Sequence, residues 1–188
     1  ARYFSKLAGA FYPYAAGKLA HGVGFSHPAS GIYGAASFNE YGDIAVPRPH
    51  NTMLAGVDGT RSITLSADIA TSDFIDYLNS FAEYAEKKGA RVYFSFPPMN
   101  RAAVVPSEGA DGSTDAEKIA SDAAAYYEFF AEKLNFPVIT DPAACLMGSG
   151  YFYDTNFHLN DSGVTVNTAR LAADILRAEG STKAVTVE

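Results

Sequence analysis

The stretch TSDFIDYLNSFAEYAEKKGARVYFSF, residues 71–96, sets a helix pattern directly before a strand pattern and thereby decides the fold class. Its first part is amphipathic with helical spacing, the apolar residues being Phe74, Ile75, Leu78, Phe81, Ala82 and Ala85. Ser72 is placed to cap the start of this helix and Gly89 to end it. The β-branched and aromatic run at 91–96 stops at Pro97-Pro98, which is typical of a buried strand.

The same order repeats further along the chain. TDAEKIASDAAAYYEFFAEKLN, residues 114–135, predicts a second helix, which Thr114 and Glu117 open with a capping-box pattern. PVIT at 137–140 predicts a second strand, and a third helix is expected over about 162–179. This alternation predicts parallel strands joined by helical crossovers, an α/β layered fold. Ligands of such folds bind beyond the carboxyl ends of the strands.

The remaining segments complete a single predicted domain over 1–188. Residues 1–70 give no regular period, and we expect an irregular N-terminal segment with one helix, broken around Pro13. Residues 71–180 form the predicted core, in the order helix, strand, helix, strand, loop, helix. The tail AVTVE, 184–188, predicts a last edge strand.

Composition and charge bound the partners of the chain. Hydrophobic residues make up 48% and charged residues 19% of its 188 residues, which is typical of a globular protein. The formal net charge is −7 and no basic stripe occurs, so no nucleic-acid partner is predicted. No run of ~18 apolar residues occurs that would predict a membrane span.

The cysteine and histidine content argues against a metal centre. The one cysteine, Cys145, excludes an intrachain disulfide and a zinc site built on cysteine pairs, and we expect it to be a small buried apolar residue. The four histidines, His21, His27, His50 and His158, show no standard ligand spacing. No metal and no cofactor is predicted.

The loop YFYDTNFHLNDSG, residues 151–163, carries the groups best suited to chemistry. His158 is a natural general base at neutral pH, and Asp154 can hold its ring in one tautomer if the loop curls. Asn160 or Asp161 is placed to cap the following helix. The same Asp-His pair also fits an ordinary surface hydrogen bond, and the four aromatic residues between Tyr151 and Phe157 fit core packing better than a substrate platform.

Two segments together, FYDTNFHLNDSGVTVNT at 152–168 and RVYFSFPPMN at 91–100, resemble the SGNH (GDSL-type) hydrolase and acyltransferase superfamily. Members end with an Asp and a His in one loop, followed by an Asn and a Gly-containing last helix. The matching residues here are Asp154, His158, Asn160 and Gly163. The resemblance implies a flavodoxin-like three-layer sandwich and Ser-His-Asp acyl transfer, which removes or moves acyl groups on sugars and lipids.

The chain departs from the family pattern in two ways. The family places its Asp three residues before the His, whereas Asp154 precedes His158 by four, which leaves Asp141 as the reserve acid. The family nucleophile, a Ser in a Gly-Asp-Ser-like turn, and the Gly and Asn of the oxyanion hole are not found. Ser37 has the best sequence context but too little chain after it, and Ser149 lies too close to the His loop.

We therefore expect this chain to be the C-terminal part of an SGNH fold, with the nucleophilic Ser upstream and the missing N-terminal half as its partner. The expected activity is that of a serine esterase or O-acyltransferase on acyl, chiefly acetyl, esters of carbohydrate or envelope polymers. The resemblance implies a bacterial, extracytoplasmic or envelope-associated location. The alternative is a non-catalytic α/β carbohydrate-binding or scaffolding module, which 13 Phe and 12 Tyr permit although Trp is absent. Replacement of His158 by Ala would distinguish the two.

Overall fold

The chain divides into two compact units, Ala1–Pro47 and Arg48–Glu188. The computed structural model describes residues 37, 39–40, 45–107 and 115–180. The predicted helix near Pro13 and the predicted tail strand lie outside the described residues, and the single domain over 1–188 stays a prediction. In the first unit, the carbonyl oxygen of buried Ser37 accepts a hydrogen bond from Ala45 N at 2.7 Å.

The second unit contains the three helices predicted from the 3.6-residue periodicity, which are confirmed as α2 (Ser72–Glu86), α3 (Asp115–Lys133) and α4 (Asp161–Ala178). Thr114 of the predicted capping box lies outside the described residues. None of the described helices is long and apolar enough to cross a membrane.

The helix ends refine the sequence prediction. The cap of α2 is Thr71 and not the predicted Ser72, because Thr71 keeps an extended backbone while Ser72 is already helical, and Thr71 Oγ1 accepts from Phe74 N at 3.2 Å. Gly89 follows α2 with a φ of +83°, a left-handed conformation that glycine adopts without strain. Asn160 caps α4, as its Oδ1 accepts from Gly163 N at 2.9 Å.

Three extended segments pair in parallel, and the segment that follows α2 lies in the middle. Ile63 bridges Val104 on one side. On the other side Phe94 bridges Val138, and strand β1 (Met99–Asn100) pairs with strand β2 (Leu146–Met147). The predicted strands at 91–96 and 137–140 are thus reduced to a single bridge. Prolines 97, 98 and 137 explain this, because each lacks the N–H that a regular ladder needs.

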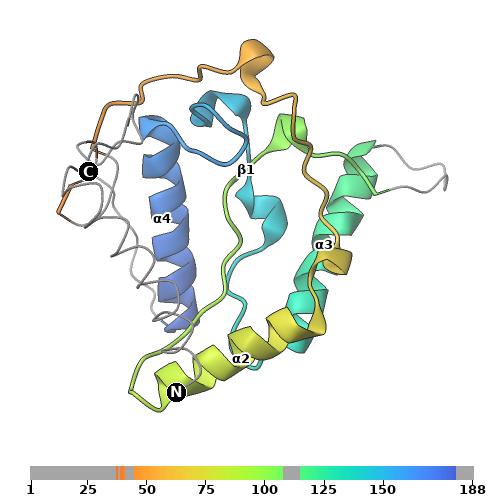
Figure 1. The fold of residues 1–188 in the computed structure, drawn as a ribbon, viewed down its shortest axis with the longest axis vertical. Coiled ribbons are helices and arrows are strands. Elements are labelled where there is room, and N and C mark those ends of the chain that lie inside the picture. The colour runs from red at the N-terminus through yellow and green to blue at the C-terminus, as the bar shows by residue number, and fades with distance from the viewer. Residues whose placement is uncertain (1–36, 38, 41–44, 108–114, 181–188) are drawn as a thin grey trace, which may run out of the picture. The chain divides into compact units, whose positions relative to one another are not determined.

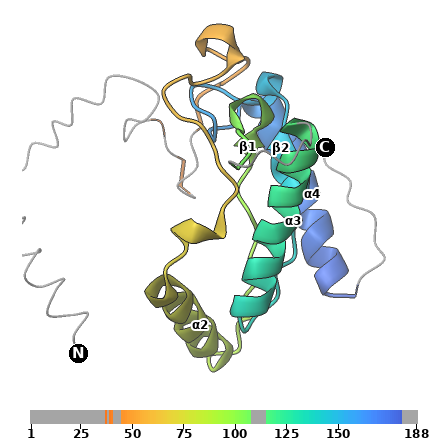
Figure 2. The ribbon, with the colours of Figure 1, turned by 90° about the vertical axis from the view of Figure 1, so that its right-hand side faces the viewer.

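These pairings make the second unit an α/β structure with parallel strands. Figure 1 shows β1 between α3 and α4, and Figure 2 shows β1 and β2 side by side at one end of the unit. Helices α2 and α3 each join neighbouring parallel segments, as the alternation predicted. The carboxyl ends of β1 and β2 therefore point to the same edge.

Aromatic residues build the core beneath α3. Phe94 stacks on Phe130 with ring centroids 4.9 Å apart, and Phe96 packs against Tyr126 at 5.2 Å. Such ring pairs contribute roughly 0.5–1.5 kcal/mol beyond the area they bury. Helix α2 behaves differently. It buries Ile75 and Ala82, while a row of large rings stays exposed at helical spacing, namely Phe74, Tyr77, Phe81 and Tyr84.

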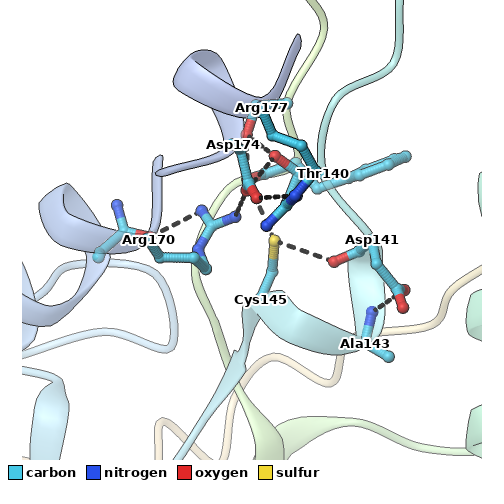
Figure 3. A network of polar contacts seen from close by, with 10 residues as sticks. Thr140, Asp141, Ala143, Cys145, Arg170, Asp174 and Arg177 are labelled. Carbon is cyan, nitrogen blue, oxygen red and sulfur yellow. Dashed lines mark hydrogen bonds and ion pairs between the residues drawn. The ribbon is translucent and has the colours of Figure 1, made fainter. Parts of the chain in front are cut away.

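A buried polar cluster fastens α4 to the third extended segment (Figure 3). Asp174 is buried on α4, and its carboxylate accepts from Thr140 Oγ1 at 2.9 Å. Arg170 and Arg177 pair with the same carboxylate at 3.1 and 2.8 Å. A buried carboxylate is stable only when its lone pairs are used in this way. Cys145, which is fully buried as expected, lies beside the cluster.

Candidate functional site

The loop that carries Asp154 and His158 is a short hairpin. Phe152 and Leu159 form an antiparallel bridge, and two backbone bonds close it, from Tyr153 N to His158 O at 2.7 Å and from Asn160 N to Tyr151 O at 3.0 Å. Phe152 is fully buried and anchors the hairpin in a small apolar cluster with Leu159. The aromatic residue at this position is therefore core packing, and the turn after it is presented at the surface.

The hairpin brings the predicted pair together. His158 Nδ1 lies 3.0 Å from Asp154 Oδ1, so the spacing of four residues, one more than in the family pattern, is spanned by the turn. The side chains are 49% and 27% exposed, which leaves the imidazole accessible from solvent. Thr155 Oγ1 accepts from His158 N at 3.0 Å and stiffens the turn. A carboxylate at Nδ1 favours the tautomer whose Nε2 can accept a proton.

The reserve acid, Asp141, has another role in the structure. Its Oδ1 accepts from Ala143 N at 2.8 Å and caps the 3-10 helix Pro142–Cys145. A hollow of about 660 Å³ between α3 and α4 is lined by Asp141 and by Asp174, and neither Asp154 nor His158 belongs to its lining. Among the described residues, the carboxylate at His158 Nδ1 is that of Asp154.

Asn156, inside the turn, was not predicted from the sequence. Its side chain is buried and makes a full set of hydrogen bonds. Nδ2 donates to the carbonyl oxygens of Asp58 and Arg61 at 3.0 and 2.8 Å. Oδ1 accepts from Asp58 N at 3.0 Å and from Asn100 Nδ2 at 3.3 Å. The turn of the hairpin is thereby held against the loop over 58–61.

Asn100, at the carboxyl end of β1, joins the site to the sheet. It is fully buried, and its backbone N–H donates to Asn156 O at 2.9 Å. Its Oδ1 accepts from Ser149 Oγ at 3.1 Å, and its Nδ2 donates to Gly56 O at 3.0 Å. The segment after the Pro-Pro strand and the hairpin loop therefore meet at the carboxyl end of β1. The Asn at the end of the Pro-Pro strand was the available sequence signal.

The family-pattern residues after His158 fix the start of α4. Asn160 Nδ2 donates to the carbonyl oxygens of Gly150 and Phe152 at 2.6 and 3.2 Å. Gly163 is buried so close to the hairpin that an added Cβ would lie 2.1 Å from Tyr151 O. Asp161 is not the helix cap, and its carboxylate instead accepts from Arg48 N at 2.9 Å.

The two serine candidates are placed differently. Ser149 opens the 3-10 helix Ser149–Tyr151, and its hydroxyl donates to the buried side chain of Asn100. Ser37 belongs to the first unit, where it is buried. A nucleophilic Ser acting with His158 stays a prediction.

Beside His158 lies a hollow of about 430 Å³. Its lining comes from the hairpin turn and the loop held by Asn156, namely Asp58, Thr60, Arg61, Thr155, Asn156, Phe157 and His158. Thr60 donates to Asp58 Oδ1 from its hydroxyl at 2.6 Å and from its backbone N–H at 3.0 Å. These hydrogen bonds lower the pKa of Asp58, so this carboxyl is ionised at neutral pH.

Comparison of the chain with protein-family models, characterised proteins and solved structures finds no match. Among the described residues, no three His, Cys, Asp or Glu side chains are grouped so that they could hold a metal ion. The hairpin and the hollow beside it are therefore the features of the molecule that bear on its function.

Proposed function

We propose that this chain supplies the general base and its orienting acid to an SGNH-like serine esterase or O-acyltransferase. The observation that carries the proposal is the 3.0 Å contact between His158 Nδ1 and Asp154 Oδ1 on an accessible hairpin beyond the strand ends. In this proposal the parallel segments and helices of the second unit belong to a flavodoxin-like three-layer sandwich. The proposed substrates are acyl, chiefly acetyl, esters of carbohydrate or envelope polymers, met outside the cytoplasm.

The proposed reaction has two steps. A Ser hydroxyl upstream of this chain attacks the ester carbonyl, His158 Nε2 takes its proton, and the ester C–O bond breaks as the alcohol leaves with that proton. Water or a sugar hydroxyl then attacks the acyl-enzyme, gives its proton to His158, and releases the acid or the new ester together with the free Ser. The Asp154 carboxylate stabilises the imidazolium that forms in each step.

The general base alone is insufficient for turnover. The nucleophile and the oxyanion hole contribute most of the rate in acyl transfer, and both are assigned here to the upstream half. We therefore expect residues 1–188 alone to lack esterase activity and the protein with its native upstream sequence to have it.

A second candidate is supported by the exposed rings of α2. Phe74, Tyr77, Phe81 and Tyr84 recur at intervals of three and four residues and form one exposed aromatic row. Exposed aromatic rows bind sugar rings or partner proteins. The chain would then be a non-catalytic carbohydrate-binding or scaffolding module, in which His158 has no special role.

Labelling with a fluorophosphonate, followed by intact-mass and peptide mapping, tests the enzyme proposal. The sample is the protein with its native upstream sequence, as wild type and with His158→Ala. His50→Ala is the matched control, because His50 is an exposed histidine outside the hairpin. The expected result is one Ser adduct upstream of residue 1 that His158→Ala abolishes and His50→Ala retains.

Two other outcomes have definite meanings. An adduct on a Ser within residues 1–188 that depends on His158 would keep the esterase and move its nucleophile into this chain. A folded wild-type protein without any adduct would contradict the esterase proposal and favour the binding module.

A further inference from the structure

The hollow beside His158 combines ionised groups with one exposed aromatic ring. Asp58 and Arg61 face it from one loop, and the half-exposed ring of Phe157 faces it from the hairpin. Its volume of about 430 Å³ falls within the roughly 300–1,000 Å³ range of small-molecule sites. The hollow is therefore large enough for a ligand, and all of its lining residues except Phe157 carry polar groups that can orient one.

Asp58 and Arg61 each keep side-chain atoms that can form further hydrogen bonds. Both Thr60 bonds go to Asp58 Oδ1, and Oδ2 has no hydrogen bond within the described part of the chain. The guanidinium of Arg61 likewise makes no hydrogen bond or ion pair with the residues that the structure describes, although its charge acts on Asp58. A carboxylate oxygen accepts hydrogen bonds and a guanidinium donates up to five. The hollow thus presents one strong acceptor beside one strong donor.

The pairing of charges selects the class of ligand. Asp58 is ionised, so its negative charge offsets that of Arg61 and the hollow does not favour an anion. A neutral polyol suits it better, because each hydroxyl both donates and accepts a hydrogen bond. The ring of Phe157 adds an apolar surface of the kind that packs against the C–H face of a sugar.

We infer that this hollow is a carbohydrate subsite. A pyranose ring stacks on Phe157, and neighbouring hydroxyls bind Asp58 Oδ2 and the Arg61 guanidinium. His158 lines the same hollow, which puts an acyl group carried by the bound sugar beside the imidazole. That last placement rests on the proposed function, whereas binding of the sugar does not.

The scaffold of the subsite is the buried side chain of Asn156. Its bonds to Asp58 and Arg61 use only backbone groups of those residues, so the two side chains stay available to the hollow. The hairpin and the opposite loop are thereby held at a fixed separation before any ligand arrives. Such preorganisation lowers the cost of ordering the site on binding.

Saturation-transfer NMR and titration calorimetry on residues 1–188 test the subsite. The probes are the methyl glycosides of glucose, galactose, mannose and N-acetylglucosamine, each with and without one O-acetyl group. We expect at least one probe to bind, and Phe157→Ala and Arg61→Ala each to raise its Kd about tenfold or more. The matched control is Arg91→Ala, an exposed arginine, which we expect to leave Kd unchanged. Phe81→Ala tests the rival site, the aromatic row of α2.

The outcomes separate this inference from the enzyme proposal. Binding that persists in His158→Ala and is lost in Phe157→Ala supports the subsite even if no esterase activity is found. Loss of binding in Phe81→Ala with none in Phe157→Ala would overturn it in favour of the α2 aromatic row. If no probe binds to the folded wild-type chain, the inference is wrong, whatever the fluorophosphonate result.

Discussion

His158 Nδ1 and Asp154 Oδ1 lie 3.0 Å apart across the turn of a hairpin whose ends are held by buried residues. The fold of the hairpin therefore positions the side chains of Asp154 and His158 next to each other. The backbone hydrogen bond from Tyr153 N to His158 O sets the distance between the two arms of the hairpin, and the Thr155 hydroxyl fixes the turn between them. This is the arrangement by which a carboxylate holds an imidazole in one tautomer and one orientation.

The first prediction concerns the orienting acid. Under the proposed function, Asp154→Asn keeps the shape of the side chain and removes the charge that stabilises the imidazolium of His158. We expect kcat for a simple acyl ester to fall about 10²-fold or more, a typical share for acid–base catalysis. Steady-state kinetics measures it. Asp141→Asn is the control, and a comparable loss in that variant instead would return the role to the reserve acid.

The second prediction concerns Asn156. Asn156→Ala would remove the side-chain partner of part-buried backbone groups of Asp58 and Arg61, and it would leave the Asn100 amide with Gly56 O as its remaining acceptor. Unsatisfied buried groups cost roughly 1–3 kcal/mol each before relaxation, so we expect the free energy of unfolding to fall by about 2–4 kcal/mol. Urea denaturation checks this value. The exposed Asn135→Ala is the matched change, and equal losses in the two variants would argue against the anchoring role.

The sequence predicted features that depend on local pattern. Helices α2, α3 and α4 follow from apolar spacing, and the Asp154–His158 pair follows from residue type and proximity in one loop. The shortened strands depend on where prolines interrupt a ladder, and the exposure of Phe74 and Phe81 depends on how α2 packs, which periodicity does not specify. Asn156 was missed because its partner Asn100 is 56 residues away, and its other partners are backbone groups without a sequence signature.

The third prediction concerns Gly163. An alanine Cβ there would lie 2.1 Å from the Tyr151 carbonyl oxygen and 3.0 Å from Leu159 Cδ2, so α4 or the hairpin must move. Alanine gains about 1 kcal/mol of helix propensity over glycine, but overpacking against backbone costs roughly 1–3 kcal/mol or more. We expect Gly163→Ala to lower the free energy of unfolding by about 1–3 kcal/mol. Gly150→Ala, where an added Cβ meets nothing within 4 Å, should change it little.

The fourth prediction concerns Asp174. Asp174→Ala would remove the carboxylate that Arg170, Arg177 and Thr140 share. Removing one partner of a buried charge pair lowers the free energy of unfolding by about 3–5 kcal/mol. Because the arginines are partly exposed, we expect a loss near the lower end of this range. The exposed Asp76→Ala on α2 is the matched control. A thermal or urea transition that is equally unaffected in both variants would show that the cluster does not stabilise α4.

The last prediction concerns Cys145. Its thiol is fully enclosed, and burial raises its pKa from the usual 9.0 to about 11. Because the thiolate is the reactive form, we expect a thiol reagent at pH 8 to label the native protein far more slowly than the urea-unfolded protein.

The raised pKa of Cys145 also favours the folded state below pH 9. As the pH rises from about 9 through about 11 the unfolded chain loses its proton first, and this part of the stability is lost. The difference in unfolding free energy between wild type and Cys145→Ala, measured from pH 8 to 11, isolates that contribution from other groups that titrate there. A difference that stays constant across this range, or native labelling as fast as in urea, would show that the thiol is open to solvent.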